Sequence, residues 1–351
     1  MLLHRPSVSS TADCAGTGTP TNGTGAWNPI PVLGFRPLTE YRFLAYTMGM
    51  DSLATRIKNA IPPSGGFSVW FLGQNSFVLK GSDGFTVAID PYLSDHCATR
   101  GKTSGPTPKS RLFPPPLLPS ELSVDLVLLT HSHCDHADSE TLEALAKNNR
   151  IRVAGSRDAL RVAQDAGFQL ERLRTLHPGE EVTFFRNPGV LAAAQRIRAG
   201  LGESGLTVWT TFALPTDGTD LNHVGFLLRF AGGATFWNTG DTAWCDTLPL
   251  LTGSGIRGAL KSWNSSATGP DVMAVCINAG YGNLSHWDAA RLAGAVQARY
   301  VVPCHWDLFP HNSLNPEPFR TSLEKNAPQG VYSLMEREKR YDFGKDGFGP
   351  A

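Results

Sequence analysis

This sequence of 351 residues lacks the features that mark proteins with large charged or apolar partners. Lys plus Arg and Asp plus Glu are each 31, so there is no basic excess for nucleic acid or an anionic membrane surface. No run approaches the roughly 18 apolar residues of a membrane span, and the N-terminus lacks the basic and long apolar regions of a secretory signal. We therefore expect a cytoplasmic protein that acts on a small molecule, with no nucleic-acid or membrane partner and with homo-oligomer formation left open.

Cysteine is also scarce and shows no pattern. The chain has six cysteines, with no CxxC pair and no framework spacing. This usage favours a reducing compartment over a disulfide scaffold. Cys134, Cys245 and Cys304 stand close to candidate metal-binding residues. We expect them to be small buried side chains and not ligands.

Hydrophobic residues make up 41% of the chain, enough for a full core, but the N-terminal part has few of them. Residues 9–31 are rich in Gly, Thr, Ser and Pro and have no apolar period, so we predict a flexible tail over residues 1–38. Apolar positions at helical spacing return in residues 39–60, which predicts one or two helices in an N-terminal extension over residues 39–64. The main domain is then expected over residues 65–351.

The main domain begins with a pattern typical of antiparallel strands. From Phe67, three short strands joined by glycine-containing turns are predicted. Ser139 and Ser156 are predicted to cap two helices that follow a buried strand. Further strands are expected at 151–155, 206–212, 224–230, 234–240, 273–277 and 299–304, and a further helix at 286–298. The strands form two batches, each followed by helices, so we predict an α/β four-layer αββα sandwich in preference to a doubly wound parallel sheet.

The strongest chemical signal follows the apolar strand at 125–130. Residues 131–136 read HSHCDH, with His131 and His133 two positions apart, so both point the same way on an extended segment. Asp135 and His136 follow on a turn, where the chain can bring them to a second point nearby. Imidazole with carboxylate suits zinc, manganese or iron, and two such ions can hold a hydroxide between them. The spacing predicts a site for two divalent metal ions.

Two further candidate ligands stand where predicted strands end. The strand at 234–240 closes in Gly240, whose lack of a side chain permits a tight turn that leaves Asp241 free to bridge both ions. The strand at 299–304 is followed by His305. These positions complete a ligand set that a His-rich surface loop would not need.

This arrangement, HxHxDH followed by a strand-end GD and a later strand-end His, resembles the metallo-β-lactamase superfamily. Within it, residues 65–335 are similar to the L-ascorbate-6-phosphate lactonase-like branch. The segments that carry the similarity read VWFLGQNSFVLK, IDPYLS, THSHCDHAD, GDT, INAGYGNLSHWDAARLA and PCHWDLFPHNSLNPEPF. The resemblance implies an αββα hydrolase that uses a metal-bound hydroxide. It assigns these metal positions: His131, His133, Asp135, His136, Asp241 and His305.

The resemblance leaves the third histidine of the first metal site to be chosen. Superfamily members usually supply it just before the strand that precedes GD, where this chain has His223, and His177 is the competing candidate. Asp135 and Asp241 are the predicted catalytic carboxylates, with Asp135 orienting the hydroxide and relaying a proton to the leaving group. Asp138 and Asp307 are either orienting partners of the ligand histidines or ordinary turn and capping residues.

Substrate contacts are expected from two loops around the cleft. The residues that the resemblance places there are Tyr281, Asn283, Asp307, His311 and Asn312. Arg111, with Lys102 and Lys109, is a candidate phosphate-binding group. We expect a lactone or ester of a small, optionally phosphorylated, sugar acid as substrate. A phosphodiesterase of the same fold is the main alternative, and a non-catalytic metal-binding module is the second.

Overall fold

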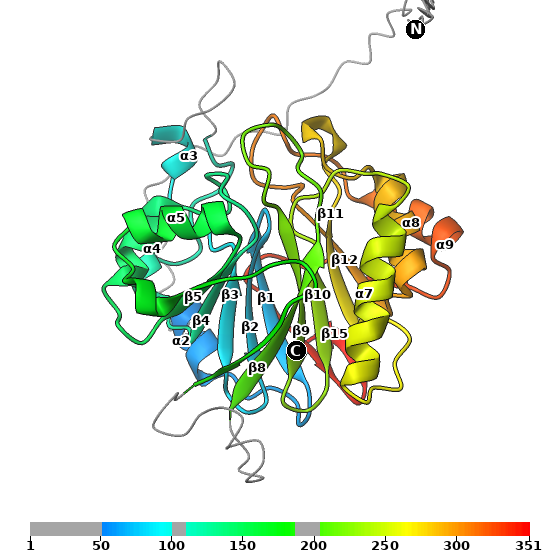
Figure 1. The fold of residues 1–351 in the computed structure, drawn as a ribbon, viewed down its shortest axis with the longest axis horizontal. Helices are drawn as coiled ribbons and strands as arrows, with labels where there is room; N and C mark the ends of the chain where they lie inside the picture. Colours follow the sequence, from blue (N-terminus) through cyan, green and yellow to red (C-terminus); the bar gives the residue numbers. More distant parts are fainter. Residues whose placement is uncertain (1–50, 100–109, 187–203) are drawn as a thin grey trace, which may run out of the picture. The chain divides into compact units, whose positions relative to one another are not determined.

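The computed structural model describes residues 51–99, 110–186 and 204–351. In this part of the chain, two β-sheets lie face to face with helices on their outer sides (Figure 1). The predicted tail and the first part of the predicted extension lie outside the described residues. The four-layer αββα prediction is confirmed.

The first sheet has eight strands and begins with the predicted antiparallel hairpins. In spatial order the strands are β15 (Gly347–Pro350), β14 (Arg340–Gly344), β1 (Phe67–Gly73), β2 (Ser76–Gly81), β3 (Thr86–Ile89), β4 (Leu126–Leu129), β5 (Arg152–Gly155) and β6 (Leu173–Thr175). The strands from β15 to β3 pair antiparallel, and those from β3 to β6 pair parallel. The parallel half places the ends of β3 and β4 at the same edge.

The second sheet has seven strands with a similar division. In spatial order they are β13 (Val331–Tyr332), β12 (Tyr300–Cys304), β11 (Val272–Cys276), β10 (Thr235–Asn238), β9 (Val224–Phe230), β8 (Gly205–Phe212) and β7 (Glu181–Phe185). β10 to β13 are parallel, and β7 to β10 are antiparallel. The ends of β10 and β12 and the start of β9 therefore share one edge.

Three groups of buried apolar residues hold the layers together. The group between the sheets includes stacked Phe67 and Phe230, whose ring centroids are 4.8 Å apart. A second group packs three helices on the first sheet: α2 (Leu53–Asn59), α4 (Ser139–Ala146) and α5 (Arg157–Asp165). A third packs three helices on the second sheet: α7 (Leu248–Ser262), α8 (His286–Val296) and α9 (Glu317–Asn326). Each sheet is thus buried on both faces, which explains the nearly continuous apolar runs in strands such as β4 and β11.

Helix starts follow the predicted capping chemistry with one correction. The Ser156 side chain accepts a hydrogen bond from the Ala159 N–H and caps α5, as predicted. For α4 the cap is Asp138 and not Ser139, because the Asp138 carboxylate accepts hydrogen bonds from the first-turn N–H groups of Glu140 and Thr141. Asp138 also accepts a hydrogen bond from Ser94, so it joins α4 to the segment after β3. This favours the capping role for Asp138 over orientation of a ligand histidine.

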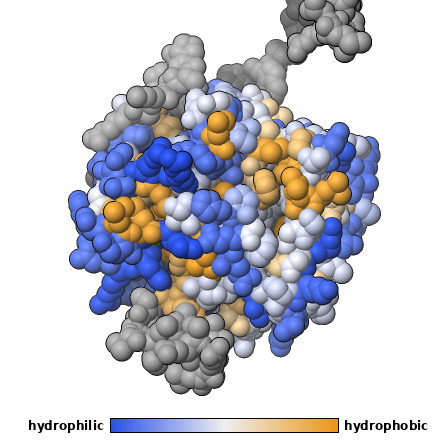
Figure 2. Space-filling model, viewed as in Figure 1, coloured by the Kyte–Doolittle hydropathy of each residue, from blue (hydrophilic) through white to orange (hydrophobic). Residues whose placement is uncertain are grey.

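The surface drawn in Figure 2 mixes hydrophilic residues with scattered hydrophobic ones. On α7, Leu250 and Leu251 are exposed. None of the described helices is both long enough and apolar enough to cross a lipid bilayer.

Candidate metal centre

The candidate ligands meet because four strands of the two sheets place their ends together. The segment 131–136 follows β4, Asp241 follows β10, and His305 follows β12. β9 runs antiparallel to β10, so His223, which directly precedes β9, lies at the same end of the second sheet. Every one of these side chains is buried except that of His133, which is half-buried.

Potential ligand atoms in this region lie within 4.8 Å of one another in three groups built from imidazoles and carboxylates. The groups are His131 with His133 and His223, His131 with His136 and Asp241, and Asp135 with His136 and His305. The first and third correspond to the two predicted metal sites. His177, the competing candidate, is exposed in the turn between β6 and β7 and belongs to none of these groups.

In the first group each histidine has one ring nitrogen facing the shared space. His131 Nε2 lies 2.8 Å from His133 Nδ1, and the His223 ring stacks on His131 with centroids 4.0 Å apart. On the outer side, His133 Nε2 lies 2.9 Å from the Thr219 hydroxyl. His223 Nδ1 donates to the backbone carbonyl of Asp241 at 3.0 Å, which leaves the lone pair of its Nε2 free to bind.

The second group has the same organisation around His136. Its Nδ1 donates to Asp90 Oδ2 at 2.7 Å. Its Nε2 lies 3.0 Å from His305 Nε2 and 3.5 Å from Asp241 Oδ1. Asp135 Oδ2 lies 3.5 Å from His305 Nε2. The inward atoms of this group therefore converge on one point beside Asp241.

Asp241 reaches the position between the two groups through a turn that needs glycine. Gly240 has φ +61°, and a Cβ there would lie 2.6 Å from the Val224 carbonyl oxygen. The Asn283 amide donates to Asp241 Oδ2 at 2.8 Å, which fixes the carboxylate. Asp241 Oδ1 faces His136 and His305 of the second group, and Asp241 also shares a group of potential ligand atoms with His131 of the first.

Asp90 is a functional residue that sequence reasoning missed. Its carboxylate accepts hydrogen bonds from His136, from the Thr130 hydroxyl at 2.5 Å and from the Asn75 amide at 2.8 Å. It directly follows β3 and has φ +41°, an unusual conformation for a residue with a side chain. A carboxylate behind a ligand histidine fixes the ring orientation and raises its basicity. The signal for Asp90 that the sequence offered was its position at the end of a strand.

Burial and the nearby carboxylates set the protonation of the histidines. Burial lowers the pKa of His131, of His223 and of His305, so these rings are held neutral, the form that binds metal. Burial also opposes protonation of His136, but Asp241, Asp135 and Asp90 together raise the pKa of His136 to about 10. A cation is therefore electrostatically favoured at this point.

The residues fit a divalent metal. Among the buried polar atoms of the described residues, His223 Nε2 and Asp241 Oδ1 have no hydrogen-bond partner, although such atoms are normally satisfied. Both belong to the groups that gather imidazole and carboxylate donors. This donor set suits zinc, manganese or iron.

Comparison with known proteins agrees with this geometry. The family described as beta-lactamase superfamily domain matches residues 86–306, more than half of the chain. The chain belongs to the metallo-β-lactamase superfamily. The matched range contains all seven candidate ligands of the centre.

Three proteins to which this chain is similar are named as hydrolases. A UPF0173 metal-dependent hydrolase from Cupriavidus taiwanensis is 26% identical over 290 residues, covering 79% of this chain and 87% of the relative. Igni18, a metallo hydrolase from Ignicoccus hospitalis, has a TM-score of 0.54 at 18% identity and covers 80% of this chain and 100% of its own. The isothiocyanate hydrolase from Delia radicum gut bacteria has a TM-score of 0.55 at 18% identity, covering 79% and 99%. The relatives support a metal-dependent hydrolase, and the two solved structures share the metallo-β-lactamase fold.

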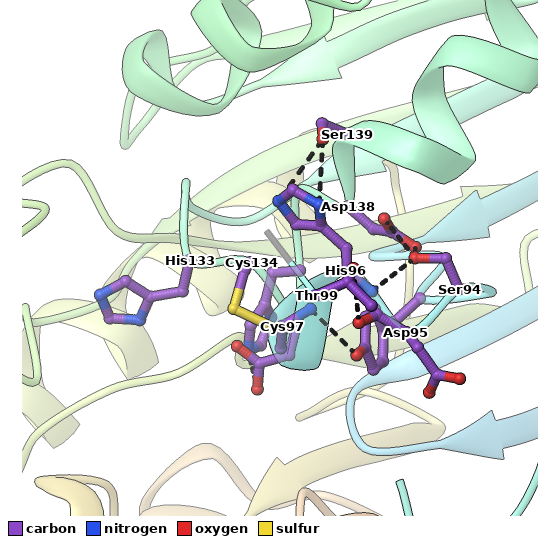
Figure 3. Close-up of a disulfide and its surroundings, with 12 residues drawn as sticks. Ser94, Asp95, His96, Cys97, Thr99, His133, Cys134, Asp138 and Ser139 are labelled. Atoms are coloured by element: carbon purple, nitrogen blue, oxygen red, sulfur yellow. Dashed lines mark hydrogen bonds and ion pairs between the residues drawn. A yellow bond between two sulfur atoms is a disulfide. The ribbon is translucent and has the colours of Figure 1, made fainter. Parts of the chain in front are cut away.

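The structure corrects the prediction for the cysteines of this superfamily member. Cys134, inside the HSHCDH motif, forms a disulfide with Cys97 of the short helix α3 (His96–Thr99), as Figure 3 shows. The two residues are 37 apart in the sequence, so no local spacing reveals the pair. Cys304 is buried with a free thiol, as expected, whereas Cys245 is only half-buried.

The five predicted substrate-contact residues fall into two sets. Tyr281 and His311 lie together at the surface, with ring centroids 5.5 Å apart, and the Asn312 amide lies 3.4 Å from His305 Nδ1. Asn283 and Asp307 are buried and form hydrogen bonds within the protein. Asn283 holds Asp241, and Asp307 Oδ1 accepts the backbone N–H of Gln74 at 2.9 Å.

Arg111, the candidate phosphate-binding residue, is buried and bonded to the protein backbone. It is only 4% exposed, and its guanidinium donates to the backbone carbonyls of Tyr92, Ser94 and Phe113. Its Nη2 has no hydrogen-bond partner among the described residues, but burial leaves the side chain little access to a substrate phosphate. Lys102 and Lys109 lie outside the described residues.

Proposed function

We propose that this chain is a hydrolase with two divalent metal ions, zinc or manganese, that opens a lactone or related ester of a small sugar acid. The observation that supports it best is the convergence of the inward nitrogen and oxygen atoms on both sides of Asp241. His131, His133 and His223 would hold one ion, and Asp135, His136 and His305 the other. Asp241 would contact both.

The ions would supply a water of lowered pKa and polarise the attacked carbonyl. The protein contributes orientation and proton transfer. Asn283 and Asp90 hold Asp241 and His136 in place, so the centre needs little rearrangement during the reaction. Asp135 is a carboxylate within the second group, and we assign it the role of orienting the attacking water and carrying a proton to the leaving oxygen.

The groups beside the second site favour a substrate rich in hydroxyls. Tyr281, His311 and Asn312 place hydrogen-bonding groups there, whereas the candidate phosphate ligand Arg111 is buried against backbone carbonyls. An unphosphorylated sugar lactone or ester therefore suits these loops better than a phosphorylated one. The assignment also rests on the resemblance to the lactonase-like branch.

The test is turnover of a substrate panel by protein stripped of metal and then loaded with zinc or with manganese. The panel contains a sugar γ-lactone, its 6-phosphorylated form, a simple carboxylic ester and bis-p-nitrophenyl phosphate. We expect the unphosphorylated lactone to give the highest kcat/KM. A higher value for the phosphodiester would contradict the lactonase proposal and identify a phosphodiesterase, and no turnover with any metal would point to a binding module.

A further inference from the structure

Gln74, in the turn between β1 and β2, has its side chain inside the metal centre. It is 1% exposed, and its amide Nε2 lies 2.6 Å from Asp135 Oδ2 and 3.0 Å from His305 Nε2. These are the inward-facing atoms of two candidate ligands of the second ion. Gln74 is thus in direct contact with the second group without having been counted among its ligands.

The backbone of Gln74 is fixed from both sides. Its N–H donates to Asp307 Oδ1 at 2.9 Å, and its carbonyl accepts the N–H of His305 at 2.6 Å. Gln74 has φ +58° and His305 has φ +62°, a region that residues with side chains rarely adopt. Gln74 and His305 thus both have unusual backbone conformations and are hydrogen-bonded to each other. Such strained backbone is typical of functional sites.

The chemistry of a carboxamide suits a metal site. A half-turn of the terminal amide exchanges Nε2 with Oε1 and leaves the rest of the side chain in place. Amide oxygens bind divalent cations, more strongly for harder ions such as manganese than for softer ones. The Gln74 side chain can therefore direct an oxygen to the point where Asp135 and His305 converge.

We propose that Gln74 is a further residue of the second metal site and supplies its carboxamide oxygen as a neutral donor beside Asp135 and His305. The proposal rests on the metal centre described above. It also gives Asp307 a role, because that buried carboxylate holds the Gln74 backbone. Asp307 is then a positioning residue for the second ion, acting through Gln74.

The test measures binding of the first and second equivalents of Mn²⁺ and Zn²⁺ to metal-stripped wild type, Gln74→Leu and Gln74→Glu. Gln74→Leu keeps the side-chain size but removes the donor, so we expect the second equivalent to bind at least 10-fold more weakly and the first to change less than 3-fold. Gln74→Glu supplies an oxygen of the same reach, so it should bind the second ion at least as tightly as wild type. The Co²⁺ absorption of the second equivalent should shift in Gln74→Leu.

The matched control is Gln297→Leu, because Gln297 also has positive φ, +56°, but lies exposed at the end of α8. It should bind both ions as wild type does. Unchanged second-ion affinity and Co²⁺ absorption in Gln74→Leu would overturn the proposal. If that variant does not fold, weaker second-ion binding by Gln74→Glu would overturn it. Failure of the wild type to bind two ions would instead refute the proposed function itself.

The Cys97–Cys134 disulfide supports a second, independent proposal. Cys134 stands between the candidate ligands His133 and Asp135, and the bond ties their loop to α3 (Figure 3). Both cysteines belong to an apolar cluster with Leu308 and Phe309, which follow the ligand His305. The disulfide therefore ties the loop that carries His133 and Asp135 to α3, and it packs against residues that follow His305 on the second sheet.

We infer that the redox state of this disulfide controls metal binding at the second site, and that the oxidised form is the active one. Cys134 is half-buried whereas Cys97 is fully buried, so the thiolate of a dithiol reductant reaches Cys134 Sγ first. The attack forms a mixed disulfide and releases Cys97, which takes up a proton. The second thiol of the reductant then closes its own disulfide and releases Cys134 as a thiol, so two electrons and two protons pass to the protein.

The test compares oxidised protein with protein reduced by dithiothreitol, which is removed before metal titration. Thiol alkylation and mass measurement after unfolding establish each state. We expect reduction to weaken the second ion at least 10-fold and reoxidation to restore it. The Cys97→Ser, Cys134→Ser double variant should behave as reduced protein in both conditions, and Cys245→Ser as wild type. Equal affinities in the two states, or alkylation of both Cys97 and Cys134 in protein prepared under oxidising conditions, would overturn the inference.

Discussion

Replacement of His223 by alanine tests whether the strand entrance of β9 supplies a metal ligand or only a packed ring. The side chain is 3% exposed and makes one hydrogen bond, from Nδ1 to the Asp241 carbonyl, besides stacking on His131. Loss of that hydrogen bond costs about 1 kcal/mol, and the space left by the ring costs about 1–2 kcal/mol more. We expect the free energy of unfolding of metal-free protein to fall by about 2–3 kcal/mol.

A ligand role adds an effect that packing cannot produce. Removal of an outer-shell partner typically weakens metal binding about 10–100-fold, so loss of a direct ligand should weaken the first ion by more than about 100-fold. The second ion, which the proposal assigns to Asp135, His136 and His305, should be affected much less. The assay is stepwise metal titration of stripped protein at a temperature where the variant is folded.

The matched control is His177→Ala, which removes an exposed histidine from the turn between β6 and β7. It should change neither stability nor metal binding measurably. Two ions bound to His223→Ala with wild-type affinity, together with a loss of stability, would show that His223 is a packing residue and refute the ligand assignment.

Three further predictions concern Asp90 and Asn283, which hold candidate ligands in place, and the candidate ligand His136. Asp90→Asn should weaken the second ion about 10–100-fold, because His136 loses the carboxylate that orients it; metal titration checks this, and wild-type affinity would contradict it. Asn283→Ala should lower kcat about 10-fold with little change in KM, because Asp241 loses a hydrogen bond that fixes its carboxylate, and a change in KM alone would argue for direct substrate contact. Because the pKa of His136 is raised to about 10, the metal-free protein holds a proton on this ring at pH 7, so metal binding should release about one proton and become stronger as the pH rises. Calorimetry in buffers of different ionisation enthalpy measures the number of protons released, and a value of zero would contradict the prediction.

The sequence predicted the layers well where apolar runs and capping residues are local signals. The hairpins from Phe67 and the helices α5 and α8 lie where predicted. α7 was not predicted, because three glycines in LPLLTGSGIRGALKS lower its helix propensity and tertiary packing against β8 and α8 must compensate. β14 and β15 were missed because charged and glycine-rich residues there do not show a strand pattern, although β14 pairs with β1.

The residues of the candidate site also divide into those that the sequence predicted and those that it did not. The HSHCDH spacing and the strand-end positions of Asp241 and His305 are visible in the sequence, and the structure brings these side chains together. The roles of Asp90, Gln74 and Cys97 depend on contacts between segments far apart in the chain. A single sequence gives no signal for such contacts beyond the fact that Asp90 and Gln74 follow strands.

The most direct test of the two-ion hydrolase is stepwise addition of Zn²⁺ or Mn²⁺ to stripped protein while sugar γ-lactone hydrolysis and bound metal are measured together. We predict that two ions bind per chain and that turnover appears with the second equivalent. Asp241→Ala, which lacks the shared carboxylate, should bind both ions poorly and lose activity by orders of magnitude. Full metal content and full turnover in Asp241→Ala, or wild-type activity that saturates with one ion, would contradict the account.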